Sequence, residues 1–436
     1  MSGRSRAGAI ALVASVCAAL SCGRGDDGAV TLRFWAMGSE GELVPQLLAG
    51  FEREHPDIHV AVQQLPWTSA HEKLLTAYVG EATPDVAQLG NTWIAELAAL
   101  DALTPLGPAL ASSSTVKPDD YFAGIWATNQ IDGQLYGVPW YVDTRLIFYR
   151  RDLFAGGWHA GPPSNWDQWL ASLRAVKRRV GDHRYAILLP LDEFDQLLSL
   201  ALETGDPLIR DGRWGNFRSA GFRRALAFYL QLFVEQLAPI ATQVEVSNAW
   251  EELQRGYFAS LLHGPWSVGE LRRRWPADMQ DQWATAVLPG PSGPGGGIAG
   301  GASLVVFRRA EHPKAAWQLI EYLSRPDIQR QMYALTGDLP PRRSSWDAAA
   351  LAGDPQIQAF RAQLEHVTGT PPLPEWERIV TEMRILSERA VRQTSPNTTP
   401  EQLAAIVDAM VSELDRRTDQ LLEKRRWILD RVRSAR

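Results

Sequence analysis

Residues 30–38 read VTLRFWAMG, a run of strand-forming residues that ends at a glycine. Over residues 43–51 the apolar side chains then recur at helical spacing, until Pro56 stops the pattern. From residue 58 to residue 62 apolar and polar side chains alternate, as they do in a half-buried strand. This order of strand, helix and strand decides the fold class. It predicts an α/β fold in which helices cover a mostly parallel sheet.

The same order continues along the chain and suggests a second lobe. A chain of 436 residues exceeds what one hydrophobic core usually supports, so we expect two lobes. A Pro/Gly-rich loop over residues 288–301 precedes the last predicted strand. The further expected elements are helix 69–78, strand 85–89, strand 146–149, helices 166–178 and 222–234, strand 302–307, helix 313–323 and a last helix that follows the capping pattern Thr399-Pro400-x-Gln402.

The N-terminus has the pattern of an export signal. Arg4 and Arg6 precede the apolar run 7–20, which is too short to span a bilayer and ends at Cys22. We therefore predict a lipoprotein signal peptide over residues 1–21, lipidation of Cys22 and a tether over 22–30. A plain secretory signal with an incidental Cys22 is the alternative. The protein is then expected in the cell envelope, in the periplasm or on the outer face of the cytoplasmic membrane.

Composition and motifs argue against several classes of function. The net charge of −6 disfavours nucleic acid as the main partner. Residues 295–300 fit G-x-G-x-x-G, but the segment that follows reads as a strand where a dinucleotide site needs a helix. His55 and His59 flank Pro56 and have no Cys partner or H-E-x-x-H motif. We predict no metal and no cofactor.

The loops after the first strands are the candidate binding loops. In open α/β sheets ligands bind at the carboxyl ends of the strands, which here are followed by residues 35–42, 65–68 and 90–93. Trp126, Trp169 and Trp317 lie in helical patterns and read as core residues. Other tryptophans fall at strand ends or turns, where a ligand role is as plausible as packing: Trp35, Trp67, Trp93, Trp140 and Trp266, the last directly after the turn Gly264-Pro265.

Several segments, in this order, resemble bacterial extracellular solute-binding proteins of ABC importers for sugars, the group that includes maltose-, maltodextrin- and trehalose-binding proteins. The segments that carry the resemblance are FEREHPDIHV (51–60), PDVAQLGNTWIAELAALDAL (84–103), GVPWYVDTRLIFYRRDLF (137–154), LLHGPWSVGEL (261–271), GGASLVVF (300–307) and HPKAAWQLIEYLSRPDIQRQMYALTGDLPPRR (312–343). The resemblance implies a two-lobed periplasmic-binding-protein fold of type II. It places an N-terminal lobe at 31–143 plus 300–340 and a C-terminal lobe at 144–299 plus 341–436.

The resemblance also implies a ligand cleft between the lobes. It puts Glu40, Asn91, Thr92, Trp93, Tyr141, Asp143, Trp266 and Gly301 in this cleft, and Trp67, Trp140 and Asp192 are added from their place at strand ends and turns. Aromatic rings cover the apolar face of a pyranose, and carboxylates and amides bind its hydroxyls. Asp143 has the alternative of pairing with Arg145. Ala302 follows Gly301 where the family often has Trp, so one aromatic wall is absent there.

The predicted function is the capture of an oligosaccharide, with a disaccharide as the expected size, and its delivery to ABC permease subunits. The protein is then no enzyme, and we expect a monomer. Two alternatives remain open on the sequence alone. A secreted carbohydrate-active enzyme would need two carboxyl groups facing each other across one bond. A sugar-sensing module would close in the same way without transport.

Overall fold

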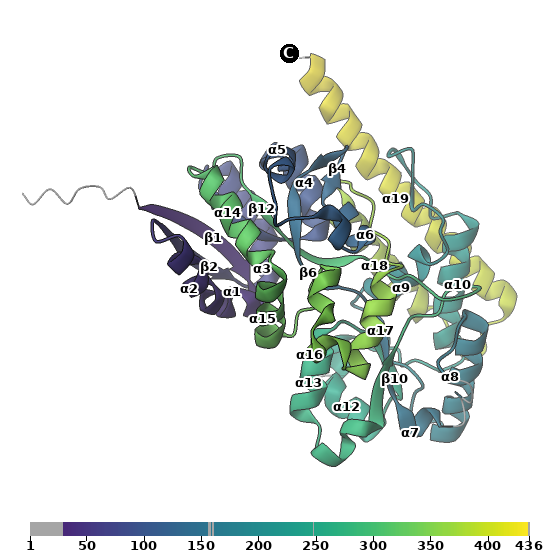
Figure 1. The fold of residues 1–436 in the computed structure, drawn as a ribbon. Coiled ribbons are helices and arrows are strands. Elements are labelled where there is room, and N and C mark those ends of the chain that lie inside the picture. Colours follow the sequence, from purple (N-terminus) through teal and green to yellow (C-terminus); the bar gives the residue numbers. More distant parts are fainter. Residues whose placement is uncertain (1–28, 156–157, 159–160, 247, 435–436) are drawn as a thin grey trace, which may run out of the picture.

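The first lobe is built on a five-stranded sheet in a computed structural model that describes residues 29–155, 158, 161–246 and 248–434 (Figure 1). The strand order is β2-β1-β3-β12-β6. β1 runs parallel to β2 and β3, whereas β12 is antiparallel to both of its neighbours, so four of the five strands share one direction. The strands are β1 (Val30–Met37), β2 (Ile58–Leu65), β3 (Val86–Gly90), β6 (Gly137–Asp143) and β12 (Gly300–Val306).

Helices cover both faces of this sheet, and β1 shows why. Leu32, Phe34 and Ala36 pack into one hydrophobic cluster, while Trp35 and Met37 pack into another. Successive side chains of a strand point to opposite faces, so the unbroken apolar run in β1 is that of a strand buried on both sides. The covering elements are α1 (Gly38–Leu43), α2 (Pro45–Glu54), α3 (Trp67–Val79), α4 (Ile94–Ala99), α14 (Pro313–Leu323) and α15 (Pro326–Thr336).

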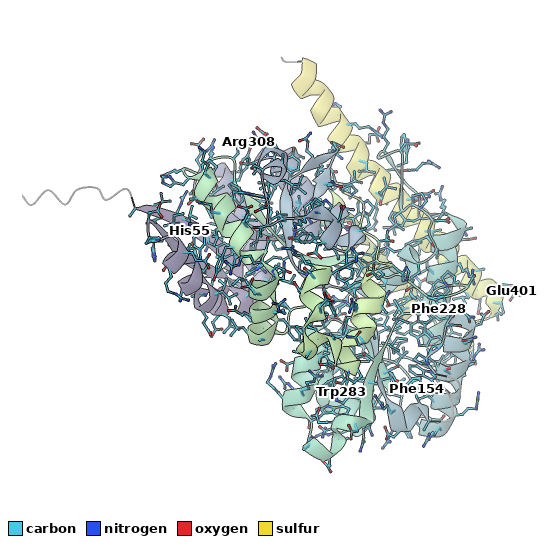
Figure 2. All side chains as sticks on the ribbon, viewed as in Figure 1. His55, Phe154, Phe228, Trp283, Arg308 and Glu401 are labelled. Carbon is cyan, nitrogen blue, oxygen red and sulfur yellow. The ribbon has the colours of Figure 1, made fainter. Side chains whose placement is uncertain are left out.

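The second lobe has a smaller, antiparallel sheet of order β10-β7-β11 and is mostly helical (Figure 1). Figure 2 shows that side chains fill the space between its helices, where Phe154, Phe228 and Trp283 lie. Its strands are β7 (Leu146–Arg150), β10 (Ser260–His263) and β11 (Trp283–Ala286), and its helices include α7 (Arg151–Phe154), α8 (Trp166–Val180), α9 (Asp195–Leu202), α10 (Ala220–Val234), α11 (Gln243–Val246), α12 (Ala249–Arg255), α13 (Trp266–Arg274), α16 (Ala349–Ala352), α17 (Pro355–Leu364), α18 (Trp376–Arg392) and α19 (Pro400–Ser434).

Two short hairpins and two short α-helices add to these elements. They are β4 (Gln130–Ile131) with β5 (Gln134–Leu135), β8 (Ile209–Arg210) with β9 (Trp214–Gly215), α5 (Gly107–Ala111) and α6 (Ala123–Ala127). The long helix α19 packs against α10, α18 and β9. Within the described residues, no helix combines the length and apolarity that a membrane span requires.

The chain passes between the two sheets at three places. β6 ends at Asp143 in the first sheet, and β7 begins at Leu146 in the second. β11 of the second sheet leads through the Pro/Gly-rich loop back to β12 of the first. At the third place Leu339 forms a bridge to Val142, with 2.9 Å between the Val142 nitrogen and the Leu339 oxygen. The three connections therefore lie side by side, beneath the site described next.

Candidate ligand-binding site

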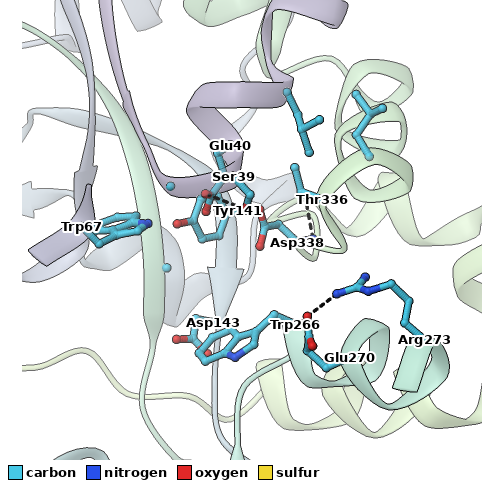
Figure 3. Close-up of a pocket in the computed structure, with 15 residues that line it drawn as sticks. Ser39, Glu40, Trp67, Tyr141, Asp143, Trp266, Glu270, Arg273, Thr336 and Asp338 are labelled. Atoms are coloured by element: carbon cyan, nitrogen blue, oxygen red, sulfur yellow. Dashed lines mark hydrogen bonds and ion pairs between the residues drawn. The ribbon is translucent and has the colours of Figure 1, made fainter. Parts of the chain in front are cut away.

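A cavity of about 680 Å³ opens where the first sheet meets α13 of the second lobe (Figure 3). We call the side formed by Glu40, Tyr141, Thr336 and Asp338 the first wall. The side formed by Asp143, Trp266, Glu270 and Arg273 is the second wall. Trp67 from the start of α3 lies at one end. The remaining lining residues are Gly38, Ser39, Leu43, Gly90, Gly301 and Leu335.

The first wall depends on a tight turn directly after β1. Gly38 has a φ of +54°, which bends the chain into α1 and leaves no room for a side chain. A Cβ at this position would lie 2.9 Å from both the Glu40 carboxylate and the Trp67 ring. The turn thus brings Glu40, which is only 6% exposed, against the cavity beside Trp67. Glycine is the residue that this close approach requires.

Buried acidic groups dominate the first wall. Burial and the neighbouring Glu40 carboxylate raise the pKa of Asp338 above its ordinary value. Burial, with smaller effects from the same two carboxyl groups, raises the pKa of the Tyr141 hydroxyl. Gln88 holds that hydroxyl through a 3.1 Å hydrogen bond, while its own oxygen accepts from the Met37 nitrogen at 2.7 Å. The first wall is therefore rigid and rich in acceptors.

The second wall presents an aromatic ring at the start of α13. Trp266 is the first residue of this helix, directly after Gly264 and Pro265, and remains 37% exposed. Its ring lies 5.0 Å from the Arg145 guanidinium carbon and 5.2 Å, edge to face, from the His263 ring. Both contacts fix the ring from the protein side. The Trp266 side chain also borders the cavity.

Arg145 links the second wall to the interior of the second lobe. Its two terminal nitrogens donate to Asp143 at 2.9 Å and to Asp195 at 3.0 Å. Burial raises the pKa of Asp143 to about 6, although Arg145 pulls it down. Burial and then Arg145 lower the pKa of His263 to about 3, so this ring is neutral at physiological pH. The charges behind Trp266 are thus already paired within the protein.

The comparison with known proteins decides the family. The sequence profile described as bacterial extracellular solute-binding protein matches residues 37–330, which is more than half of the chain. The chain belongs to this family. The structure of the sugar-binding protein MalE from Xanthomonas citri is similar at 52% identity and a TM-score of 0.87, covering 92% of this chain and 99% of that one.

Two curated relatives of the solute-binding protein come from Streptomyces. The diacetylchitobiose binding protein DasA of Streptomyces coelicolor is 22% identical and matches over 80% of this chain and 81% of its own. An uncharacterized lipoprotein in the oleD 5' region of Streptomyces antibioticus is 29% identical, with 73% and 72% covered. The α/β, two-lobed binding-protein fold predicted from the sequence is confirmed. The family consists of binding proteins, as the sequence also predicted.

The cavity brings together six of the residues that the sequence singled out. These are Glu40, Trp67, Tyr141, Asp143, Trp266 and Gly301. Asp143 pairs with Arg145, as the alternative interpretation predicted, and its side chain also lines the cavity. The aromatic residues expected in the core are buried there, with Trp126 and Trp317 at 8% exposure and Trp169 at 0%.

Five predicted residues lie outside the cavity lining. Trp140 is 2% exposed and packs on Phe34 with 5.9 Å between ring centroids, beside the register shift of β6 against β12 between Ala302 and Ser303. Trp93 packs against Trp67, with 5.5 Å between their ring centroids. Asp192 accepts a 2.8 Å hydrogen bond from the Gln243 nitrogen at the start of α11.

Asn91 and Thr92 line a separate hollow of about 230 Å³ near residues 369–372. The Asn91 oxygen accepts from the Ser303 hydroxyl at 3.2 Å, and Thr92 donates to Glu377 of α18. These contacts tie the loop after β3 to β12 and α18. The loop follows the carboxyl end of its strand as predicted, but its polar side chains turn toward protein instead of toward the cavity.

Four charged or polar members of the two walls were not predicted from the sequence: Thr336, Asp338, Glu270 and Arg273. The sequence held a signal for Asp338, because it follows Gly337 just before the predicted lobe boundary at residue 340. In the structure Gly337 has a φ of +83°. Glu270 and Arg273 had a weaker one, since they lie four and seven residues after Trp266 on one face of the same helix. The predicted lipidation site, Cys22, lies outside the described residues.

Proposed function

We propose that this solute-binding protein captures an oligosaccharide between the first and second walls and delivers it to an ABC permease. The observation that carries the proposal is the exposed ring of Trp266 facing buried carboxyl groups across one cavity. A pyranose has an apolar face of C–H groups, which a tryptophan ring covers, and a rim of hydroxyls, which carboxylates bind. The volume is within the ordinary range of small-ligand sites, about 300 to 1,000 Å³.

The names of related proteins support a sugar as the ligand. The Xanthomonas citri protein at 52% identity is named as sugar-binding. More distant relatives are named for diacetylchitobiose and, in Bacillus subtilis, for galactooligosaccharide. We infer a disaccharide as the cargo. Trp67 at one end of the cavity and Trp266 in the second wall would each cover one ring (Figure 3).

Capture is proposed to work by closure of two lobes, 31–143 plus 300–340 and 144–299 plus 341–436. Apart from Asp143, which ends β6, the two walls draw on different lobes, so a ligand that touches both stabilises the arrangement in which they face each other. The three connections beneath the cavity would act as the hinge, because a few residues between packed elements can absorb such a motion. The closed form presents surfaces of both lobes to the permease.

We further propose that Cys22 carries a lipid anchor after removal of residues 1–21. The relative from Streptomyces antibioticus is named a lipoprotein, and the family is described as extracellular. An anchored binding protein remains close to its permease, which raises the effective concentration of the cargo complex there. No bond of the sugar is made or broken in this function.

The test is a calorimetric titration of residues 23–436 with maltose, trehalose, cellobiose, maltodextrins and amino-sugar disaccharides. A ligand that binds only the folded state must raise the unfolding temperature by mass action, so a thermal shift checks each hit. We expect one class of sugar to bind saturably and to be recovered intact. Hydrolysis of the bound sugar would favour the enzyme instead, and silence across the panel would rule out a sugar cargo of these kinds.

A further inference from the structure

Glu40 and Asp338 form a pair of buried carboxyl groups in the first wall. Glu40 is 6% exposed and Asp338 is 8% exposed, and both line the cavity. Figure 3 shows the Asp338 carboxyl group pointing toward Glu40 and Tyr141. The two acidic side chains come from segments that are far apart in the sequence. Glu40 belongs to α1, and Asp338 belongs to the segment after α15. Their meeting is therefore a product of the fold and not of local sequence.

The groups around the pair supply hydrogen bonds but no positive charge. The Ser39 hydroxyl lies 3.3 Å from Glu40 Oε2, and the Asp338 nitrogen donates to Thr336 Oγ1 at 3.0 Å. Asp338 Oδ2 is buried and has no hydrogen-bond partner among the residues that the structure describes. A carboxylate oxygen that is enclosed and unpartnered costs free energy unless a ligand or a proton satisfies it.

The charged groups that face the pair from other elements do not neutralise it. Asp143 on β6 adds further negative charge. Across the cavity, Arg273 of α13 is paired with Glu270, and Arg145 is paired with Asp143 and Asp195. Among the described residues no basic side chain pairs with Glu40 or Asp338. Two adjacent buried carboxyl groups without a cation cannot both ionise at little cost, so one of them retains a proton.

We propose that Asp338 is a ligand-binding residue that shares one proton with Glu40, so that the pair binds neighbouring hydroxyls of a neutral sugar. This inference rests on the proposed function and specifies its ligand class. A hydroxyl both donates and accepts, and the protonated pair offers it one O–H donor beside several acceptor oxygens. An anionic sugar, such as a uronate or a sugar phosphate, would bring a further negative charge to the same place and bind poorly.

The raised pKa of Asp338 agrees with this arrangement, because burial and Glu40 both favour its neutral form. Loss of the shared proton at alkaline pH would place two negative charges in contact and remove the only donor of the pair. The affinity for a neutral sugar should then fall by up to about tenfold per pH unit, the limit for one linked proton. At acidic and neutral pH it should vary little for this pair.

The experiment compares Asp338→Asn with the natural protein from pH 5 to pH 9, using the best neutral disaccharide of the panel and its uronate counterpart. An asparagine has the shape of the protonated aspartic acid and keeps one donor group and one acceptor. We expect Asp338→Asn to weaken disaccharide binding at pH 6 by up to about tenfold, because its amide cannot share a proton with Glu40, and to lose the alkaline fall. Asp192→Asn is the matched control, since its carboxyl group lies outside the cavity.

A second measurement follows the unliganded protein. The folded state keeps a proton that the unfolded chain loses above about pH 4. The unfolding free energy should therefore decrease as the pH rises above about 4, for as long as the folded state retains that proton. In Asp338→Asn the dependence of the unfolding free energy on pH should be smaller by the contribution of one proton. Sugar binding with an alkaline fall that Asp338→Asn retains would overturn the inference. Absence of all sugar binding, with the stability slope still lost in Asp338→Asn, would instead overturn the proposed function and leave the shared proton in place.

Discussion

The two walls of the cavity hold similar numbers of acidic groups but treat their charge in opposite ways. In the second wall Asp143 is paired with Arg145, and Glu270 accepts from Arg273 and Arg274. In the first wall no basic side chain among the described residues reaches Glu40 or Asp338. A paired carboxylate is held in place before a ligand arrives, whereas an unpaired buried one needs a ligand or a proton. The second wall is thus preorganised by the protein, and the first wall is completed by what binds.

The difference follows from where each wall lies in the chain. Asp143 and Arg145 are two residues apart on a connection between sheets, so a local pair forms readily and Asp195 of α9 joins it. The first wall gathers Glu40, Tyr141 and Asp338 from three distant segments, and its neighbouring residues contribute only hydroxyls, an amide and backbone groups. Substitutions of charged residues should therefore have different effects in the first wall and in the second wall.

The largest effect is expected from removing the cation of the second wall. Arg145→Met would leave Asp143 and Asp195 buried without their partner and take away the group beneath the Trp266 ring. Breaking a buried ion pair in this way typically costs about 3–5 kcal/mol, and we expect a loss of that size in the unfolding free energy. Urea denaturation at pH 7, followed by tryptophan fluorescence, measures it.

Arg255→Met is the matched control for that variant. The Arg255 side chain is 65% exposed and pairs with Glu251 and Glu252 on the surface of α12. Exposed pairs of this kind contribute less than about 1 kcal/mol. If Arg145→Met lowered the unfolding free energy no more than Arg255→Met, the second wall would not depend on its internal ion pairs. The proposed contrast between the two walls would then be wrong.

The next effect concerns ligand affinity more than stability. Trp266→Ala removes the aromatic face of the second wall, and we expect the dissociation constant of the bound disaccharide to rise about 30-fold, which is about 2 kcal/mol. Trp214→Ala is the control, since Trp214 is 39% exposed in the same lobe and packs against Arg426, away from the cavity. Equal affinities in both variants would mean that Trp266 is a surface residue without a ligand role.

These substitutions also show what could be predicted from the sequence. Trp266 was identified because a Gly-Pro turn before an aromatic residue is a local signal, and the structure places it at the first position of α13. The strands and helices around the first sheet follow from the period of their apolar residues, as β2 and α14 (Pro313–Leu323) illustrate. Features encoded within about a dozen residues of each other were readable.

Features that depend on distant contacts were not readable. The apolar run of β6 does not reveal that Trp140 is enclosed in the core while Tyr141 borders the cavity, because every residue of the run is buried and both side chains lie in the same cluster. Asp338 becomes a site residue only when the segment after α15 folds back against α1. Thr92 was placed on the correct loop, but its hydroxyl is bound to Glu377, which is 285 residues away in the chain.

A smaller effect is expected at Glu203, which lies outside both walls and has no basic partner within the described part of the chain. Among the same residues its buried Oε1 has no hydrogen-bond partner, and its Oε2 accepts from the Trp166 indole at 3.1 Å. Burial raises the pKa of Glu203 well above its ordinary value. Since the folded state binds a proton that the unfolded chain releases above about pH 4, stability is lost as pH rises, by up to about 1.4 kcal/mol per pH unit.

Glu203→Gln removes that proton exchange and should flatten the pH profile of the unfolding free energy between about pH 5 and pH 8. The disaccharide affinity should not change, because Glu203 does not line the cavity. Glu251→Gln on the exposed face of α12 is the control and should leave the profile unchanged. A Glu203→Gln protein that keeps the natural slope would show that this carboxyl group is ionised in the folded state. In that case an unpaired buried carboxyl group would not imply a retained proton in the first wall either.

The smallest expected effect lies far from both walls, at the start of α19. Gln402 donates its backbone N–H to the Thr399 hydroxyl at 3.3 Å, and Gln402 Oε1 accepts from the Thr399 nitrogen at 2.9 Å, which is a capping box. Thr399→Ala should lower the unfolding free energy by about 1 kcal/mol, because it leaves helix N–H groups without a partner. Thr381→Ala, inside α18, replaces an exposed helical threonine with a better helix former and should have little or no cost. Neither variant should alter sugar affinity if ligand binding is confined to the two walls. A changed dissociation constant in Thr399→Ala alone would show that α19 also positions the second wall.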